Sequence, residues 1–340
     1  MFRSSILNFE SLEGVKLRVP WTLLAVAGVI AAMELGIRLI PEKKLVPETS
    51  RQGEIFFMEK EVLPRFDKPK IVLMGSSRMR RAVVPAQLDA ELGLPKNSTI
   101  NLGLAMARVY ESLYLYERNE AQLKDAKLAI LNLDDWQVST GPKMSNSLYE
   151  THGPLLERLR FPEDQRTRLF LDGIFHMRVM LKLVPGAIFG RAKDTQNLKL
   201  DENNQILPPP RKERLDNFDD QIALFYNEFN VHPVMLGHIE QLARKVQANG
   251  GTFVLMQLPN RTSYQDEVER LHKEDFARER AAVEALAAKL GVELWLYARP
   301  NEIGLTDEMY EDYGHISREG AKVVTWYLAE EKIRKLNLKF

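Results

Sequence analysis

The sequence predicts an α/β protein in which a parallel sheet lies between two layers of helices, with one transmembrane helix ahead of it. From residue 70 onward, short apolar segments alternate with longer amphipathic ones, which is the pattern of strand–helix–strand units. Residues 19–40 form a long apolar stretch near the start of the chain. The 340 residues include 45% hydrophobic side chains and equal numbers of basic and acidic ones, 47 each, as is typical of a folded protein.

The first element is the apolar stretch at residues 19–40, whose first fifteen residues, Val19–Met33, carry no charge. At about 1.5 Å per residue, roughly 20 helical residues cross the hydrocarbon layer of a membrane. Trp21 stands where an interfacial anchor is expected. We therefore predict an uncleaved signal anchor preceded by a cytoplasmic segment at residues 1–18. A cleaved signal peptide and a buried helix are the alternatives.

Two charged residues, Glu34 and Arg38, interrupt the end of this stretch. They are four residues apart, so on a helix they share one face, where they can pair with each other, reach the membrane interface or contact a partner helix. The flanking charges do not orient the helix, because both sides carry three basic residues, namely Arg3, Lys16 and Arg18 before it and Arg38, Lys43 and Lys44 after it.

Residues 41–68 are charged and punctuated by proline, which indicates a juxtamembrane linker with one short element at residues 55–62. The α/β domain is expected at residues 69–340. Its predicted strands are 70–74, 99–102, 128–133, 252–258 and 292–297, and its predicted helices are 85–92, 106–122, 232–249, 265–290 and a last one from residue 318. This order favours a parallel sheet with helices on both faces.

Residues 139–230 break the alternation and are predicted to be an insertion. They contain an apolar stretch with scattered Arg and Lys, Thr167–Phe189, a triple proline at 208–210 and a charge run at 211–220. One interpretation is an insertion packed over the sheet with a solvated charged loop. The other is a cap that shapes a substrate groove or touches the bilayer through its mixed apolar and basic helix.

Composition and motifs exclude several classes of function. The chain has no cysteine, which excludes a disulfide scaffold, a cysteine nucleophile and cysteine–metal sites. A net charge of zero argues against a nucleic-acid binder. Five of the six histidines lack a metal-ligand spacing, and no glycine-rich phosphate-binding motif follows a strand. We therefore expect neither a cofactor nor a metal.

Small and ionisable residues follow the predicted strands. Since ligands of an open parallel sheet gather at the carboxyl ends of its strands, these residues are the candidates for a site. They are Ser76 and Ser77 after the first strand, Asn101 and Gly103 after the second, Asp134 and Asp135 after the third, and Asp312, Tyr313, Gly314 and His315 beyond the last.

Their types and spacing predict nucleophilic chemistry. An aspartate three residues before a histidine, as in Asp312 and His315, can turn its carboxylate onto Nδ1 of the imidazole, which leaves Nε2 free to take a proton from a hydroxyl. Ser317 is a plausible N-cap for the last helix and would hold this turn rigidly. A serine on the tight turn after the first strand could present its Oγ to the imidazole, and Gly75 permits that turn.

These blocks resemble, in their order along the chain, those of SGNH/GDSL-type hydrolases: Gly75-Ser76-Ser77, Asn101-Leu102-Gly103 and Asp312-Tyr313-Gly314-His315. The resemblance implies a flavodoxin-like three-layer fold. It also implies that Ser77 is the nucleophile, His315 the general base and Asp312 its orienting partner. The backbone N–H groups of Ser77 and Gly103 would donate to the oxyanion, and Asn101 is a further oxyanion or substrate-binding candidate.

One block departs from the family pattern. Where these hydrolases usually carry G-x-N-D, the chain has Asn132-Leu133-Asp134-Asp135, so Asp134 stands in place of the asparagine donor. An ionised carboxylate would oppose an oxyanion, and losing one donor costs about 10²–10³ in rate. Asp134 therefore points away, is protonated, or leaves the donor role to Gln137 or Arg78. Arg78 itself either binds an anionic substrate or pairs with Asp134 or Asp135.

The layout of the whole chain is similar to that of membrane-anchored relatives that cooperate with membrane-bound O-acyltransferases in modifying envelope polysaccharides. These also begin with one helix, followed by a G-S-S-like turn. The resemblance implies an acyl donor, a glycan acceptor and a membrane-bound O-acyltransferase as partner. It also implies a single-pass protein of the bacterial inner membrane with its catalytic domain on the periplasmic or extracellular side.

The leading hypothesis is thus a membrane-anchored serine acyltransferase or esterase that forms an acyl-serine intermediate at Ser77. The alternative is a non-catalytic scaffold that keeps the fold and binds a membrane partner in polysaccharide synthesis or export through the anchor and the insertion. Such a scaffold would tolerate Asp134, because no oxyanion forms in it.

Overall fold

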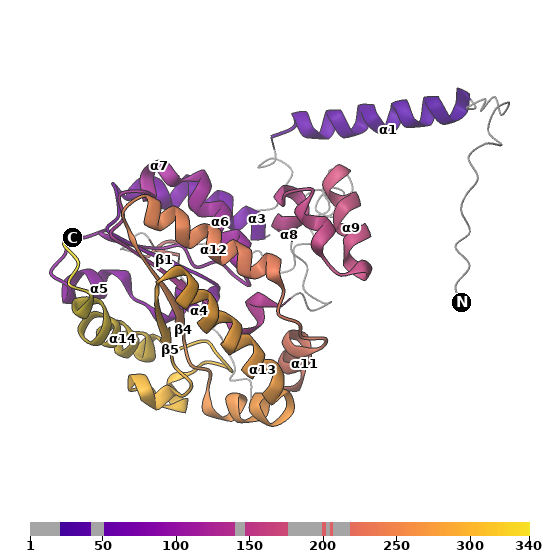
Figure 1. Ribbon diagram of the computed structural model, residues 1–340. Helices are drawn as coiled ribbons and strands as arrows, with labels where there is room; N and C mark the ends of the chain where they lie inside the picture. The colour runs from indigo at the N-terminus through magenta and orange to yellow at the C-terminus, as the bar shows by residue number, and fades with distance from the viewer. Residues whose placement is uncertain (1–20, 42–50, 140–146, 176–198, 202–204, 207–217) are drawn as a thin grey trace.

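A computed structural model describes residues 21–41, 51–139, 147–175, 199–201, 205–206 and 218–340 (Figure 1). Its centre is one parallel sheet with the strand order β2-β1-β3-β4-β5. The strands are β1 (Ile71–Met74), β2 (Thr99–Asn101), β3 (Leu128–Asn132), β4 (Thr252–Gln257) and β5 (Glu293–Leu296). This is the doubly wound, flavodoxin-like order. The predicted fold class is confirmed, and each strand lies where the sequence placed it to within two residues at either end.

The strands are apolar along their length because both faces of the sheet are covered. Successive side chains of β1 alternate between two cores: Val72 and Met74 belong to one, Ile71 and Leu73 to the other. All four are fully buried. A strand with one solvated face would instead alternate apolar with polar residues.

Helices cover the sheet from both sides (Figure 1). The core that contains Val72 and Met74 also includes residues of α6 (Val109–Arg118), α12 (Pro233–Ala248) and the second half of α13 (Thr262–Leu290). The core on the other face includes residues of α4 (Ser77–Ala82), α5 (Pro85–Glu91) and α14 (Arg318–Tyr327). Figure 1 shows α6 and α12 on one side of the sheet and α5 and α14 on the other.

The segment before the sheet differs from the predicted linker at residues 41–68. The expected short element is present, but it is longer and forms part of the core: α3 (Arg51–Phe57), η2 (Met58–Val62) and η3 (Leu63–Arg65) follow one another. Ile55, Met58 and Val62 are buried in the core beside α6. Their spacing of three and four residues is that of an apolar helical stripe, so this part of the linker prediction is wrong. Residues 42–50 lie outside the described residues.

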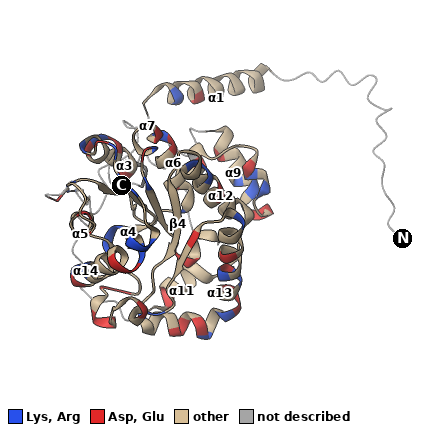
Figure 2. Ribbon diagram, turned by 60° about the vertical axis from the view of Figure 1, so that its left-hand side comes forward, with Lys and Arg blue, Asp and Glu red and all other residues tan. Residues whose placement is uncertain are grey.

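The predicted membrane anchor is the helix α1 (Trp21–Leu39), with 19 residues, none of them buried. Within the described part of the chain it is the one helix long and apolar enough to cross a membrane. Figure 2 shows it free of charged residues except near its end, where Arg38 Nε donates to Glu34 at 2.7 Å. Of the three alternatives left open for these two residues, the structure shows the pair. Residues 1–20, including the predicted cytoplasmic segment, lie outside the described residues.

The predicted insertion falls between β3 and β4. Its described helices are α8 (Ser147–His152), η5 (Glu157–Arg160), α9 (Glu163–Ile174) and α11 (Asp219–Tyr226). The triple proline, residues 176–189 of the apolar and basic stretch, and residues 211–217 of the charge run lie outside the described residues. A short helical turn, η4 (Asp135–Val138), leads from β3 toward this region.

Candidate active site

The candidate site lies where the sheet changes direction. The chain leaves β1 toward β2 on one side and reaches β3 on the other, and such a switch point opens a crevice at the carboxyl ends of the two strands. Ser77 follows β1, Asp134 follows β3, and the loop after β5 brings His315 to the same place, as the contacts below show.

The turn after β1 requires glycine at residue 75. Gly75 has φ +138°, and a Cβ there would lie 2.6 Å from the backbone oxygen of Asn132. The next residue, Ser76, is the N-cap of α4, and its Oγ accepts a hydrogen bond from the N–H of Arg78 at 3.1 Å. Ser77 is therefore the first helical residue of α4, and its position is fixed by the tight turn at Gly75 and the helix cap at Ser76 that precede it.

The loop that carries His315 is closed by the side chain of Asp312 and by a backbone bridge. Oδ1 of Asp312 accepts hydrogen bonds from the N–H groups of Gly314 at 3.0 Å and His315 at 2.8 Å. Across its base, Tyr310 and Ile316 form an antiparallel bridge. Ser317 then caps α14 by accepting from Gly320 N–H at 3.3 Å, which confirms the predicted helix start.

These two segments bring a serine, a histidine and an aspartate into one chain of hydrogen bonds. Ser77 Oγ lies 2.7 Å from Nε2 of His315, and Nδ1 of His315 lies 2.8 Å from Oδ2 of Asp312. Because an ionised carboxylate only accepts hydrogen bonds, the proton on His315 belongs on Nδ1, and Nε2 accepts from Ser77. Asp312 is fully buried, His315 is buried and Ser77 is half-buried. The expected approach of these three side chains is confirmed.

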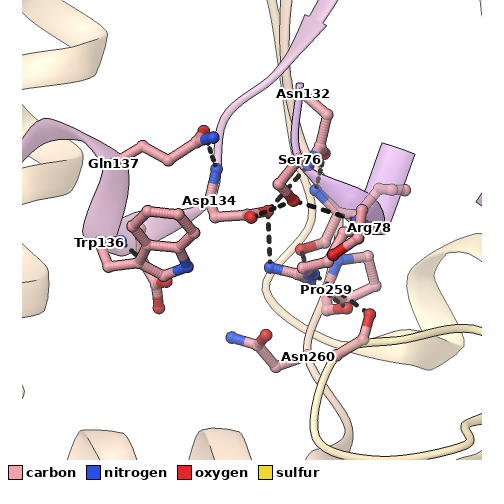
Figure 3. A network of polar contacts seen from close by, with 12 residues as sticks. Ser76, Arg78, Asn132, Asp134, Trp136, Gln137, Pro259 and Asn260 are labelled. Atoms are coloured by element: carbon pink, nitrogen blue, oxygen red, sulfur yellow. Dashed lines mark hydrogen bonds and ion pairs between the residues drawn. The ribbon is translucent and has the colours of Figure 1, made fainter. Parts of the chain in front are cut away.

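Asp134, the residue that departs from the family pattern, is turned into a buried network (Figure 3). Its carboxylate accepts from Ser76 Oγ at 2.5 Å, Asn132 Nδ2 at 2.9 Å and a terminal nitrogen of Arg78 at 3.2 Å. Its backbone N–H donates to Gln137 Oε1 at 2.8 Å. The negative charge is thus held by Arg78 and two neutral donors beneath the serine turn.

Arg78 joins three segments that lie far apart in the sequence. Its guanidinium donates to the backbone oxygens of Leu258 at 2.7 Å, Pro259 at 2.9 Å and Gly314 at 3.2 Å, in addition to Asp134. Burial alone would lower the pKa of Arg78, but the charges of Asp134 and Asp135 outweigh it and raise that pKa above its usual value.

Arg78 therefore does not have the predicted substrate-binding position. Its side chain is 3% exposed and forms an ion pair with Asp134. The structure therefore shows the alternative expectation, the ion pair. Asp135 instead accepts a hydrogen bond from the hydroxyl of Tyr226 in α11.

The oxyanion prediction also needs correction. The N–H of Gly103 donates to Oδ1 of Asn101 at 3.0 Å, and Nδ2 of Asn101 donates to the oxygen of Met79 at 3.2 Å. Both predicted groups are thus engaged within the protein, in an Asx-type turn that ties β2 to α4. Gln137 is also engaged, since its Nε2 donates to Ala107 O at 2.5 Å.

The structure gives Gly103 a different role. A Cβ on Gly103 would lie 2.7 Å from the backbone nitrogen of Arg80 and 2.9 Å from the oxygen of Ser76, so the glycine permits close packing against α4. The remaining predicted donor is the N–H of Ser77, which belongs to the first turn of α4 and has no intrahelical acceptor.

Several supporting residues were not found from the sequence. Leu258 and Pro259 supply carbonyls to Arg78, and Asn132 Oδ1 accepts from Leu258 N–H at 3.1 Å. A Cβ on Gly314 would lie 2.9 Å from Nε of Arg78, which explains the glycine before His315. One usable signal was present: Asn132 is a polar residue ending an otherwise apolar strand.

An aromatic ring of the insertion, Phe225, packs beside the site. Tyr313 lies next to His315, with ring centroids 6.0 Å apart, and Phe225 of α11 lies 5.7 Å from Tyr313. Trp136 stacks on Phe225 at 5.2 Å. Helix α11 therefore packs against the loops that carry the site.

No protein-family model matches the sequence, and no curated protein matches it. Among solved structures, the chain is similar to a proposed acylhydrolase from Bacteroides fragilis, with a TM-score of 0.41, 13% identity and coverage of 82% of this chain and 95% of that one. It is also similar to a GDSL-like lipase from Bacteroides thetaiotaomicron, with a TM-score of 0.40, 13% identity and coverage of 83% and 98%. The contacts of Ser77, His315 and Asp312 carry the functional conclusion.

Proposed function

We propose that this protein is a membrane-anchored serine esterase or acyltransferase of the SGNH/GDSL type. One observation carries the proposal: the hydrogen-bonded chain from Ser77 through His315 to Asp312, with 2.7 Å and 2.8 Å between the bonded atoms. A hydroxyl, an imidazole and a buried carboxylate in this order are the constellation of a serine nucleophile with its base and orienting group, on whatever fold they occur.

In the proposed reaction, His315 Nε2 takes the proton of Ser77 while Oγ attacks the carbonyl carbon of an ester. The tetrahedral oxyanion accepts a hydrogen bond from the N–H of Ser77. Its collapse expels the alcohol, which receives the proton from His315, and leaves an acyl-serine. Water or a second hydroxyl, deprotonated by the same imidazole, then attacks the acyl group; the bond to Ser77 Oγ breaks, and Oγ takes the proton back from His315. Asp312 keeps the Nδ1 proton in place throughout and stabilises the imidazolium.

We further propose that the substrates are acyl esters of a cell-envelope polysaccharide, with an acyl donor, a glycan acceptor and a membrane-bound O-acyltransferase as partner. The apolar helix α1 and the order of the blocks support this proposal. The protein would then be a single-pass protein of the bacterial inner membrane with its α/β domain on the periplasmic or extracellular side.

A scaffold without catalysis is the second candidate, because specific contacts favour it. Gly103 N–H is already bonded to Asn101, and Asp134 replaces a neutral donor. These contacts leave Ser77 N–H as the oxyanion donor among the groups predicted from the sequence. A scaffold would keep the buried network as a structural element and would bind a polysaccharide-synthesis partner through α1 and the insertion.

Labelling with a fluorophosphonate separates the two. The enzyme predicts covalent modification of the full chain on the peptide that contains Ser77, and loss of that modification in Ser77→Ala and His315→Ala. Ser112→Ala is a matched control, because it removes another buried hydroxyl from α6 without touching the site. Labelling that persists in Ser77→Ala, or a folded wild-type protein that takes up no label, would overturn the enzyme proposal.

A further inference from the structure

Part of the insertion exposes a group of large apolar side chains. Leu155, Leu156 and Leu159 lie in or just before η5, and Ile174 and Phe175 lie at the end of α9. Each of the five is exposed, Leu156 by 78%. We call these five residues the insertion patch. Contiguous exposed apolar patches, unlike single exposed side chains, mark sites of contact with a protein or a membrane.

The two halves of the patch are held together by one buried side chain. Arg158 of η5 donates to the backbone oxygens of Gly153, Glu150 and Leu169, at 3.1, 2.9 and 2.7 Å. A Cβ on Gly173 would lie 2.6 Å from the same guanidinium, so the end of α9 packs directly against η5. The apolar side chains on both elements are therefore presented by one rigid unit.

This unit touches the end of the predicted transmembrane helix. A terminal nitrogen of Arg38 donates to the backbone oxygen of Ile174 at 3.0 Å, while Nε of the same guanidinium is bonded to Glu34. Figure 1 shows α9 and α8 lying below α1, nearer to it than the sheet is. If α1 spans a bilayer, its last turn lies at the membrane interface, where arginine side chains place their charge. Ile174 then lies at the same level.

We propose that the insertion patch rests on the lipid bilayer, with its apolar side chains in the zone between headgroups and acyl chains. Side chains of interfacial segments enter that zone by about 5–10 Å. Arg160 is exposed directly beside Leu159 and would face anionic headgroups, which attract basic residues. The domain is then held to the membrane at two places, α1 and the patch, which fixes its orientation. The proposal rests on the anchor proposed above and concerns lipid, not a protein partner.

The chain has no cysteine, so a single introduced thiol can carry an environment-sensitive fluorophore at one chosen position. We would reconstitute the full chain in nanodiscs with anionic lipid and compare three variants. Leu156→Cys probes the patch, and Ala27→Cys probes the middle of α1. Asn301→Cys is the control, since Asn301 is an exposed polar residue in η6 (Pro300–Ile303), after β5.

The expected result is quenching of the Leu156→Cys label by lipids that carry a spin label near the headgroup, with little or no quenching of the Asn301→Cys label. The Ala27→Cys label is tested with lipids that carry the spin label deep in the acyl chain, because residue 27 lies inside the span of α1. Quenching at Ala27→Cys by these lipids, without quenching at Leu156→Cys by the headgroup-labelled lipids, would overturn the patch proposal and leave the anchor intact. Absence of quenching at Ala27→Cys by the acyl-chain label would overturn the anchor and, with it, this inference. The fluorophosphonate reaction of Ser77 tests the proposed chemistry independently of all three variants.

Discussion

The ion pair between Arg78 and Asp134 is buried beneath the serine turn, and removing its charge on one side tests how much the site depends on it. In Asp134→Asn the shape of the side chain is kept: the amide oxygen can still accept from Asn132, and the amide nitrogen can donate to Ser76 Oγ in a reversed bond. The guanidinium of Arg78, however, loses its anionic partner in a place where its side chain is 3% exposed. We therefore expect a large loss of stability from a nearly isosteric change.

The distance between Arg78 and Asp134 sets the expected loss of stability. At 3.2 Å and an effective dielectric constant of about 20, Coulomb attraction between unit charges is about 5 kcal/mol. Removing one partner of a buried pair costs about 3–5 kcal/mol, because the other charge stays buried without compensation. For a domain of this size, each kcal/mol lowers the melting temperature by about 2–4 °C. Asp134→Asn should therefore lower it by about 10 °C.

A double-mutant cycle isolates the pair from the other bonds of Arg78. Arg78→Met leaves the carbonyls of Leu258, Pro259 and Gly314 without their donor, and this loss occurs equally in the single and the double variant. Denaturant unfolding of wild type, both single variants and the double variant should give a coupling of about 2 kcal/mol or more, at the upper part of the range for contacting residues. The double variant should then be more stable than the sum of the single effects predicts.

Two results would refute this reasoning. If Asp134→Asn unfolds at the temperature of the wild type, Asp134 does not carry the charge that balances Arg78. If the losses of stability of the two single variants add up to that of the double variant within error, Arg78 and Asp134 are stabilised by different partners and do not act as one network.

Two further changes are expected to act through backbone strain and through burial. Gly75→Ala should destabilise the protein by more than its control, Gly93→Ala. Both glycines have positive φ, +138° and +67°, but a Cβ at residue 75 would lie 2.6 Å from the backbone oxygen of Asn132, whereas a Cβ at residue 93 would have nothing within 4 Å. Equal losses of stability in denaturant unfolding would contradict the clash. Glu279→Gln should remove a pH dependence of stability. Burial, reinforced by the charge of Asp135, raises the pKa of Glu279 in the folded protein well above its ordinary value. As the pH rises above about 4, the unfolded chain loses this proton before the folded one does, so the free energy of unfolding falls until the pH reaches the folded-state pKa. Melting curves from pH 4 to 8 should show a steeper decline for the wild type and for Glu274→Gln, an exposed control in the same helix, than for Glu279→Gln. Parallel curves would show that burial does not keep the carboxyl of Glu279 protonated.

The fold and the approach of the three candidate side chains could be predicted because each depends on short-range patterns or on topology. Strands buried on both faces are continuous apolar runs, and Asp312 and His315 are close enough in sequence for their contact to follow from the spacing alone. Ser77 is 238 residues from His315, yet its place follows from topology, since both residues follow strands of one parallel sheet.

The supporting network could not be predicted, because its contacts are long-range and use backbone atoms. The carbonyls of Leu258 and Pro259 carry no signature in the sequence, although Arg78 depends on them. The linker prediction was wrong for a related reason. The charged residues and prolines around α3 indicated a linker, and the apolar stripe of Ile55, Met58 and Val62 is recognised as part of the core only from its packing in the structure.

The departure from the family pattern at Asp134 becomes intelligible when it is considered together with Arg78. Placed alone in this site, either charge would be buried without a partner, at a cost of several kcal/mol. Together they form a pair that also holds the loop of His315, through Gly314, against the helix that begins with Ser77. Arg78 directly follows Ser77, the proposed nucleophile, so the same short segment presents the hydroxyl and holds the loop of His315, the proposed base. A carboxylate at position 134 therefore serves the geometry of the site through Arg78, at the expense of a neutral donor for the oxyanion.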